Sequence, residues 1–210
     1  MEPLPPSWTL ILASLDFAFQ PIVNIHNGEY LGFECLLRGH DAAGFSSIPS
    51  LFDRAHEERL LHLVDLALRE KAVSRFRSYI GHRVKKLFYN LDIRVLDAPG
   101  YSRGATRELL KAQGLSPGSF CFEVSEQQRV LSDSQGRDVL SVYRDQGFSI
   151  AIDDYGIGFS GLQRLYECET DYLKIDGFFL SDIATSSRKR LFVAHMVGLA
   201  HVLGIKVIAE

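Results

Sequence analysis

Apolar residues follow two kinds of pattern along the chain. Short runs rich in valine, isoleucine and aromatic residues are typical of buried strands, and seven occur, at residues 17–25, 30–33, 86–90, 120–123, 148–152, 171–175 and 205–209. Stretches with helical spacing of apolar residues lie between the later runs, at residues 51–76, 103–113, 133–146 and 188–203. Several of these end at a glycine, a usual stop for a helix. The pattern therefore predicts seven strands, with helices between the later ones.

The first two predicted strands are joined differently from the rest. Asn27-Gly28 separates them, and this dipeptide is typical of a tight hairpin turn, which predicts an antiparallel pair. Strands that alternate with helices form right-handed β-α-β units in a parallel sheet. Seven strands at a repeat of roughly 25 to 35 residues, without a dinucleotide fingerprint, favour a (β/α) barrel over an open doubly wound sheet.

The two ends of the 210-residue chain set the expected boundaries of the fold. Residues 1–16 read as an N-terminal lead-in that begins with a proline-rich loose end, and residues 17–210 read as one domain. The last apolar run stops at Glu210, so an eighth strand would be absent and the seventh would keep a bare edge. We therefore expect an α/β protein with a modified TIM (β/α) barrel that is truncated at its C-terminus.

Composition and charge narrow the possible partners. The 23 Lys and Arg residues nearly balance the 26 Asp and Glu residues, and the net charge of −3 argues against DNA, RNA or an anionic membrane as partner. Three cysteines without a C-x-x-C pair disfavour a disulfide framework and a structural zinc site. The longest apolar stretch, residues 192–209, is interrupted by two histidines and a lysine, so we expect neither a signal peptide nor a membrane span. The expected location is the cytoplasm.

Polar side chains recur where the predicted strands end. They are Glu34, Asn90, Glu123, Asp153, Asp154, Lys174, Asp176 and Glu210. Because the carboxyl ends of barrel strands gather around one mouth, we expect these residues to converge. Carboxylates this close together raise one another's pKa unless a cation compensates them. Oxygen donors without histidine or thiol favour hard ions, Mg²⁺ or Mn²⁺, and the adjacent Asp153 and Asp154 could bridge or flank two of them.

Each of these residues also has a purely structural interpretation. A carboxylate just past a strand can cap the next helix, and Asp153-Asp154 can begin a turn. Lys174 can lie on a solvated strand edge. Gly156 and Gly158, which follow the aspartate pair, instead favour a loop that brings its backbone close to a ligand. Recurrence of acidic groups at so many strand ends favours the metal site.

Seven ordered motifs resemble those of the EAL domain, the bacterial phosphodiesterase domain of cyclic di-GMP signalling. They are F-Q-P-I at residues 19–22, E-C-L-L-R at 34–38, Y-N-L at 89–91, F-E-V-S-E at 122–126, D-D-Y-G-I-G at 153–158, L-K-I-D at 173–176 and V-I-A-E at 207–210. The resemblance runs from about residue 17 to the end of the chain. It implies a barrel whose first strand is antiparallel, and hydrolysis of cyclic di-GMP to linear pGpG by a homodimer.

The resemblance also implies roles for individual residues. One Mg²⁺ or Mn²⁺ ion would be held by Glu34, Asn90, Glu123 and Asp153, and a second by the shared Asp153 with Asp154 and Glu210. Lys174 would position the attacking water. The nucleotide contacts would come from Gln20, Leu36, Arg38 and Asp176, and Glu126 would anchor the loop of Gly156 and Gly158. Two cations can neutralise a phosphodiester and steady its leaving oxygen, and the Arg38 fork suits a phosphate.

Two other functions remain open. Ile157, Phe159 and Gly161 stand where the family usually has threonine, tyrosine and serine, which alters the loop. This favours a catalytically weak or inactive domain that acts as a cyclic di-GMP receptor or docks a protein partner. A barrel lyase of the enolate-forming kind also gathers carboxylates on a metal at strand ends, and it predicts no affinity for cyclic di-GMP.

Overall fold

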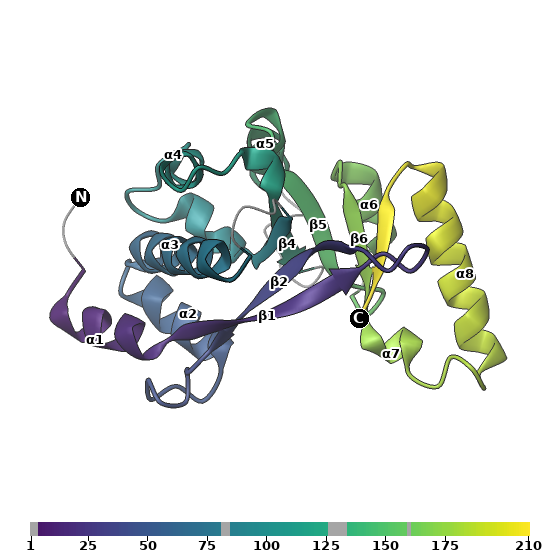
Figure 1. Cartoon of the computed structure of the whole chain (residues 1–210), viewed down its shortest axis with the longest axis horizontal. Coiled ribbons are helices and arrows are strands. Elements are labelled where there is room, and N and C mark those ends of the chain that lie inside the picture. Colours follow the sequence, from purple (N-terminus) through teal and green to yellow (C-terminus); the bar gives the residue numbers. More distant parts are fainter. Residues whose placement is uncertain (1–3, 81–84, 126–133, 159–160) are drawn as a thin grey trace. The chain divides into compact units, whose positions relative to one another are not determined.

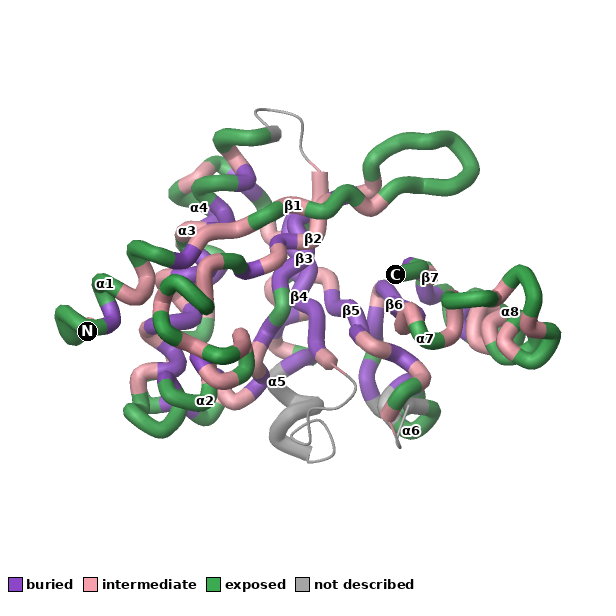
Figure 2. The backbone as a smooth tube through the Cα atoms, turned by 90° about the horizontal axis from the view of Figure 1, so that it is seen from below, coloured by how far each residue is buried: buried purple, intermediate pink, exposed green. Residues whose placement is uncertain are grey.

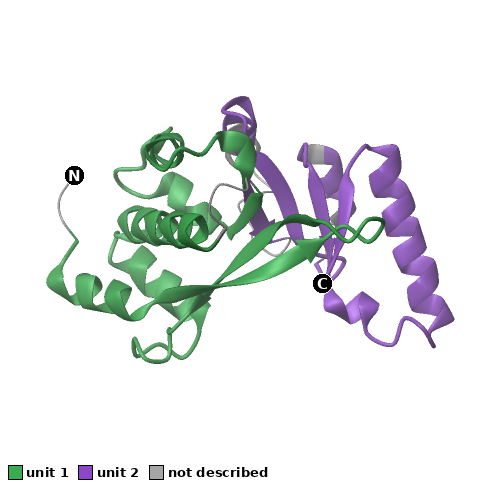
Figure 3. Ribbon diagram, in the orientation of Figure 1, with its two compact units in different colours: residues 1–120 green, residues 121–210 purple. Residues whose placement is uncertain are grey.

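Strands and helices alternate along most of the chain (Figure 1). The computed structural model describes residues 4–80, 85–125, 134–158 and 161–210. The chain divides into two units, unit 1 over residues 1–120 and unit 2 over residues 121–210 (Figure 3). Among the helices of the described residues, none combines the length and the apolar character that crossing a membrane requires.

Unit 1 is built around a three-stranded group of strands with helices beside it. Its elements are α1 (Pro6–Ser14), β1 (Asp16–Val23), β2 (Tyr30–Arg38), α2 (Ile48–Glu57), α3 (Leu61–Ile80), β3 (Lys86–Asn90), η1 (Ile93–Asp97), α4 (Ala105–Ala112) and η2 (Pro117–Ser119). β1 pairs antiparallel with β2, and β2 pairs parallel with β3. Residues 87–89 of β3 are buried and exposure returns at Asn90 (Figure 2), so the strand leaves the core where its polar residue begins.

Unit 2 contains parallel strands connected through helices. Its elements are β4 (Phe120–Ser125), whose first residue belongs to unit 1, α5 (Ser134–Asp145), β5 (Ser149–Tyr155), α6 (Gly161–Glu167), β6 (Tyr172–Ile175), α7 (Gly177–Leu180), α8 (Ser187–Val202) and β7 (Lys206–Ala209). β4, β5, β6 and β7 pair in that order, each parallel to the next. A core of Ile152, Leu173, Ala200 and Ile205, with Met196 partly buried against it, holds α8 on these strands.

The expected architecture is confirmed. All seven predicted strands are present, the first is antiparallel to the second, and the other described strand pairs are parallel. Three strands continue beyond their apolar runs: β2 extends to Arg38, β4 to Ser125 and β5 to Tyr155. Glu34, Asp153 and Asp154 therefore lie inside strands and not after them, because a strand continues as long as its backbone stays paired, whatever its side chains.

The turn between β1 and β2 differs from the expected two-residue hairpin turn. The connection covers residues 24–29, and it closes through hydrogen bonds from Asn24 N to Glu29 O and from Gly28 N to Asn24 O, both 2.8 Å. The side chain of Asn24 accepts from His26 N at 2.9 Å, and that of Asn27 accepts from Glu29 N at 3.0 Å. Asparagine favours such local turns, which explains the longer loop.

The helix predicted over residues 51–76 is two helices. α2 ends at Glu57, and Arg59 takes the left-handed conformation with φ 60°. Leu60 N then donates to Ala55 O at 2.8 Å, the six-to-one hydrogen bond of a Schellman helix end. Apolar periodicity continues across the break, since Ala55 and Leu61 are both fully buried, so the pattern alone could not locate it.

The lead-in of residues 1–16 contains an unexpected helix. Proline occupies the first helical position of α1, where its missing N–H costs nothing. Trp8 is fully buried and therefore fixes α1 to unit 1. A proline-rich start is as suited to a helix N-terminus as to a loose end, which is why the composition of this segment pointed the other way.

Candidate functional site

In unit 1, the expected substrate-binding residues lie on one face of the β1–β2 pair. Gln20 is opposite Glu34, and Asp16 is opposite Arg38, in the antiparallel register. Because side chains alternate along a strand, Glu34, Leu36 and Arg38 share a face, and the residues opposite them share it too. The Arg38 and Gln20 side chains are exposed. This face therefore presents a carboxylate, an amide and a guanidinium group to its surroundings.

Asn90 joins this face from β3. The parallel register of β2 and β3 aligns Glu34 with Phe88, so Asn90, two residues further on, points to the same side. Its side-chain Nδ2 donates to Glu34 Oε1 at 3.3 Å. The structure thus brings together two of the expected metal ligands within unit 1, and both offer oxygen donors.

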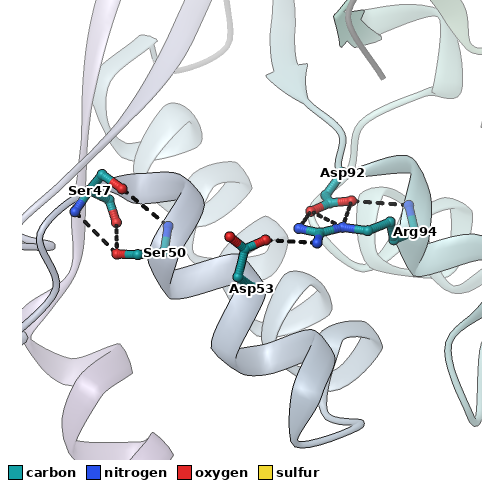
Figure 4. A network of polar contacts seen from close by, with 5 residues as sticks. All are labelled: Ser47, Ser50, Asp53, Asp92 and Arg94. Atoms are coloured by element: carbon teal, nitrogen blue, oxygen red, sulfur yellow. Dashed lines mark hydrogen bonds and ion pairs between the residues drawn. The ribbon is translucent and has the colours of Figure 1, made fainter. Parts of the chain in front are cut away.

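The segment that follows Asn90 is fixed by an ion-pair network (Figure 4). Asp92 caps η1 by accepting from Arg94 N at 3.0 Å. The Arg94 guanidinium binds the Asp92 carboxylate at 2.6 Å and Asp53 of α2 at 2.7 Å. These carboxylates raise the pKa of Arg94 through hydrogen bonds. The network ties the exit of β3 to α2 and so restricts the Asn90 backbone.

In unit 2, a buried lysine lies among three carboxylates. Lys174 is 1% exposed, and its Nζ lies 2.8 Å from Glu123, 3.0 Å from Asp153 and 2.6 Å from Glu210. Glu123 is fully buried and Asp153 is nearly so. The solvated-edge interpretation of Lys174 is therefore wrong, because water cannot reach its ammonium group.

Strand register explains why these four side chains meet. β4 and β5 align Glu123 with Ala151, and β5 and β6 align Ala151 with Tyr172. Asp153 of β5 lies two residues after Ala151, and Lys174 of β6 lies two residues after Tyr172. Because side chains alternate along a strand, both point to the same side of the sheet as Glu123. β6 and β7 align Lys174 with Ile208. Glu210 comes two residues after Ile208, directly after β7, and its side chain points to the same side.

Asp154 reaches the cluster through an irregularity in β5. Alternation would turn Asp154 away from Asp153, but the pairing of β5 with β6 shifts register between Ile152 and Tyr155, and Asp154 has φ 56°. Its Oδ2 accepts from Ser125 Oγ at 3.1 Å. Bulges that redirect a side chain and left-handed non-glycine residues are both frequent at functional sites. Burial, and then the charge of Asp153, raise the pKa of the Asp154 carboxyl.

The loop after β5 and the residue after β6 have structural roles of their own. Gly156 has φ 107°, and a Cβ there would lie 2.5 Å from the Phe179 ring, so only glycine fits. Asp176 accepts from Phe178 N at 2.7 Å and caps α7. Gly158 lies in the described part of this loop, whereas Glu126 and Phe159 lie outside the described residues.

Sequence reasoning missed two contributors to this cluster. Ser125 was read only as part of a motif, although its hydroxyl fixes Asp154. The bulge itself was also missed, and the signal for it was the pair of adjacent aspartates, which cannot both face one side of a regular strand.

The donor set of both units suits a hard divalent cation. In unit 2, the carboxylates of Glu123, Asp153 and Glu210 contact the Lys174 ammonium group, and Asp154 adjoins Asp153, so these four described carboxylates outnumber the ammonium group among them. Asp153 and Glu210 each offer an oxygen within 4.8 Å of the other. Carboxylate and amide oxygens are the ligands that Mg²⁺ and Mn²⁺ prefer.

Comparison with known proteins identifies relatives over nearly the whole chain. A model of the EAL domain matches residues 9–210. PdeI of Escherichia coli (strain K12), a probable cyclic di-GMP phosphodiesterase, is 31% identical over 206 residues, which are 95% of this chain and 26% of that protein. An uncharacterised protein of Azorhizobium caulinodans is 32% identical over 205 residues, which are 94% of this chain and 28% of that protein. The chain spans about a quarter of the length of these two relatives.

Solved structures support the same fold. BlrP1 of Klebsiella pneumoniae, in a complex with manganese and cyclic di-GMP, matches with a TM-score of 0.81 at 30% identity over 94% of this chain and 49% of that chain. Its calcium and cyclic di-GMP complex gives the same TM-score and identity over 100% of this chain and 51% of that chain. The expected fold, an incomplete (β/α) barrel with an antiparallel first strand, is confirmed.

Proposed function

The chain belongs to the EAL domain family, and on this premise we propose that it hydrolyses cyclic di-GMP to linear pGpG with two Mg²⁺ or Mn²⁺ ions. The observation that carries the proposal is the Lys174 ammonium buried among the carboxylates of Glu123, Asp153 and Glu210. A solvated acidic surface needs no buried lysine, whereas a site for a phosphodiester needs preorganised positive charge beside its reacting oxygens.

The metal ligands are assigned by motif and by donor chemistry. By these motifs Glu34, Asn90, Glu123 and Asp153 would hold one ion, and Asp153, Asp154 and Glu210 would hold the second. When bound, such a pair of ions activates water, neutralises the phosphodiester and stabilises the leaving oxygen. BlrP1, a relative at 30% identity, forms complexes with manganese or calcium and cyclic di-GMP, which supports hard divalent ions here.

The remaining residues bind and orient. Lys174, whose Nζ lies beside Asp153 and Glu210, would orient the attacking water by donating a hydrogen bond to it. Arg38 binds a phosphate oxygen pair in the forked geometry that lysine cannot supply. Gln20, Leu36 and Asp176 contact the nucleotide. Gly156 and Gly158 shape the loop beside the aspartates.

We place this activity in the cytoplasm, in a homodimer. The three cysteines are buried thiols, as expected of a protein from a reducing compartment. Light scattering of the purified chain tests the oligomeric state.

The test of the proposed function is product formation. We expect the chain with Mn²⁺ to convert cyclic di-GMP to pGpG, followed by chromatography, and EDTA to stop the reaction. Asp153→Asn should lower turnover more than about 100-fold, since loss of a shared ligand exceeds the usual effect of an outer partner. The matched control is Asp182→Asn, the same change at an exposed residue of unit 2 whose φ of 57° suits asparagine.

The outcomes separate the three candidate functions. Product formation that is lost in Asp153→Asn but kept in Asp182→Asn supports the hydrolase. Tight binding of cyclic di-GMP without product supports the receptor that the altered loop, with Ile157 43% exposed, would favour. Absence of binding in the presence of Mn²⁺ contradicts both and leaves the lyase.

A further inference from the structure

The N-terminal helix α1 is anchored on the segment that follows Arg38. Trp8 of α1 is fully buried, and its ring stacks on Phe45 with centroids 6.4 Å apart and planes 30° from parallel. The Arg54 guanidinium lies 5.7 Å from the indole centroid. The indole N–H donates to Glu58 Oε2 at 2.6 Å, so the ring is fixed on its face and at its edge.

Phe45 belongs to a compact segment between β2 and α2, residues 39–47, here named the exit loop. Ala43 N donates to Gly39 O at 3.0 Å and Phe45 N to His40 O at 2.8 Å. At its far end, Ser47 and Ser50 form a reciprocal capping box at the start of α2 (Figure 4). The loop is therefore tied internally and at its helix end, and Trp8 packs on its middle.

The near end of the exit loop touches the other end of α1. Gly39 has φ 87°, and a Cβ at this position would collide with the Ser14 carbonyl oxygen. Lys71 of α3 donates through Nζ to the carbonyl oxygens of Leu12, at 2.9 Å, and of Leu15. The C-terminal end of α1 is thus tied to α3 by Lys71, and it lies directly against Gly39, the residue that follows Arg38.

We propose that Trp8 is a positioning residue for Arg38: by holding α1 on the exit loop, it sets the place of the guanidinium group that binds substrate phosphate. The inference rests on the proposed function, and it adds to it a contribution of the N-terminal helix to substrate affinity. Forked binding of a phosphate depends on orientation, and misplacement by about 1 Å is enough to weaken a site strongly. Arg38 is exposed, and its Nη1 donates to the backbone oxygen of Leu37 at 2.9 Å, so the guanidinium group follows the backbone at the end of β2.

The experiment compares three variants of the chain. Trp8→Ala removes the ring, Trp8→Phe keeps a ring on Phe45 but removes the hydrogen bond to Glu58, and Leu10→Ala is the control on the same helix at a side chain 74% exposed. Affinity for cyclic di-GMP is measured by calorimetry with Ca²⁺, and affinity for Mn²⁺ is measured without nucleotide. Amide hydrogen exchange over residues 36–47 is measured without any ligand.

We expect Trp8→Ala to raise the Kd for cyclic di-GMP about tenfold, which corresponds to ~1.4 kcal/mol. Trp8→Phe should give a smaller rise, and Leu10→Ala none. The Kd for Mn²⁺ should stay unchanged in all three, because a general loss of structure would weaken both ligands. Exchange over residues 36–47 should accelerate in the Trp8 variants and not in strands of unit 2.

The proposed function and the positioning role of Trp8 would be contradicted by different results. If the unmodified chain fails to bind cyclic di-GMP, the proposed function is wrong, and the exchange measurement still decides the role of Trp8. If that chain binds but Trp8→Ala and Trp8→Phe retain its affinity and its exchange rates, Trp8 does not position Arg38. An equal loss of nucleotide and Mn²⁺ affinity would also contradict the positioning role, since it would show a purely structural one.

Discussion

Replacing Lys174 with methionine tests whether its ammonium group is the internal cation of the unit 2 cluster. Methionine keeps an unbranched side chain of similar length and removes only the charge and its donors. The native ammonium contacts Glu123, Asp153 and Glu210 within 3.0 Å. Lys174→Met therefore leaves three carboxylates close together without their shared partner.

The cost follows from the burial of these carboxylates. The side chain of Glu210 is 27% exposed and can be rehydrated, whereas that of Glu123 is fully buried and cannot. Removing one partner of a buried ion pair costs about 3–5 kcal/mol, so we expect the free energy of unfolding to fall by that amount. For a chain of this size each 1 kcal/mol lowers Tm by roughly 2–4 °C, which gives a fall of about 6–20 °C.

Chemical denaturation in EDTA measures the loss, and two conditions should reduce it. In the variant, burial and mutual repulsion favour the protonated form of Glu123. The difference in the free energy of unfolding between the variant and the unmodified protein should therefore become smaller as pH falls. Mn²⁺ should also make this difference in the free energy of unfolding smaller, because a bound cation would compensate the charge of the carboxylates in place of the lysine. Lys189→Met is the control: Lys189 is partly buried and its Nζ donates to Ser181 O at 2.8 Å, and we expect a change of about 1 kcal/mol, the net worth of an ordinary hydrogen bond.

A loss below about 1 kcal/mol in EDTA for Lys174→Met, equal to that of the control, would refute the reasoning. It would mean that the carboxylates are not held charged by this lysine. A loss that grows in acid would refute it as well, since protonation of Glu123 should relieve the repulsion.

Two further predictions concern the loop and the pH dependence of stability. Gly156→Ala should lower both stability and turnover, because the residue has φ 107° and its Cβ would meet Phe179; thermal melts should show no such loss for Gly198→Ala, which has open space in α8. Burial, and then the charge of Arg69, lower the pKa of His62. As pH falls below about 6.5 the unfolded chain takes up a proton that the folded chain resists, so the free energy of unfolding should decline there, and His62→Gln should flatten that decline.

Much of the cluster in unit 2 was predictable from the sequence, because the alternation of side chains along a strand determines which side of the sheet each one faces. Glu123, Asp153 and Lys174 each lie in or at the end of an apolar run, and parallel strands bring such positions to the same edge. The degree of burial was not predictable. A lysine that alternates with apolar residues is compatible with a solvated edge and with a buried partner, and only tertiary packing decides between them.

Other features depend on backbone geometry that apolar patterns do not encode. The bulge that turns Asp154 toward Ser125 requires the left-handed conformation at Asp154. Aspartate tolerates that conformation, but its presence in a sequence does not predict it. The break between α2 and α3 at Arg59 is a second case. In α1, the prolines are compatible with a helix start and with a loose end, and the long-range contacts of Trp8 with Phe45 and Glu58 favour the helix.

The central claim is that the acidic strand ends hold catalytic metal ions against a phosphodiester. Anomalous diffraction at the manganese edge, from crystals of the chain grown with Mn²⁺ and cyclic di-GMP, tests it most directly. The account predicts two manganese peaks that share Asp153, one of them also bound by Asp154 and Glu210, with the phosphate of the nucleotide beside them. Manganese bound elsewhere, or nucleotide bound with no metal at Asp153, would contradict it.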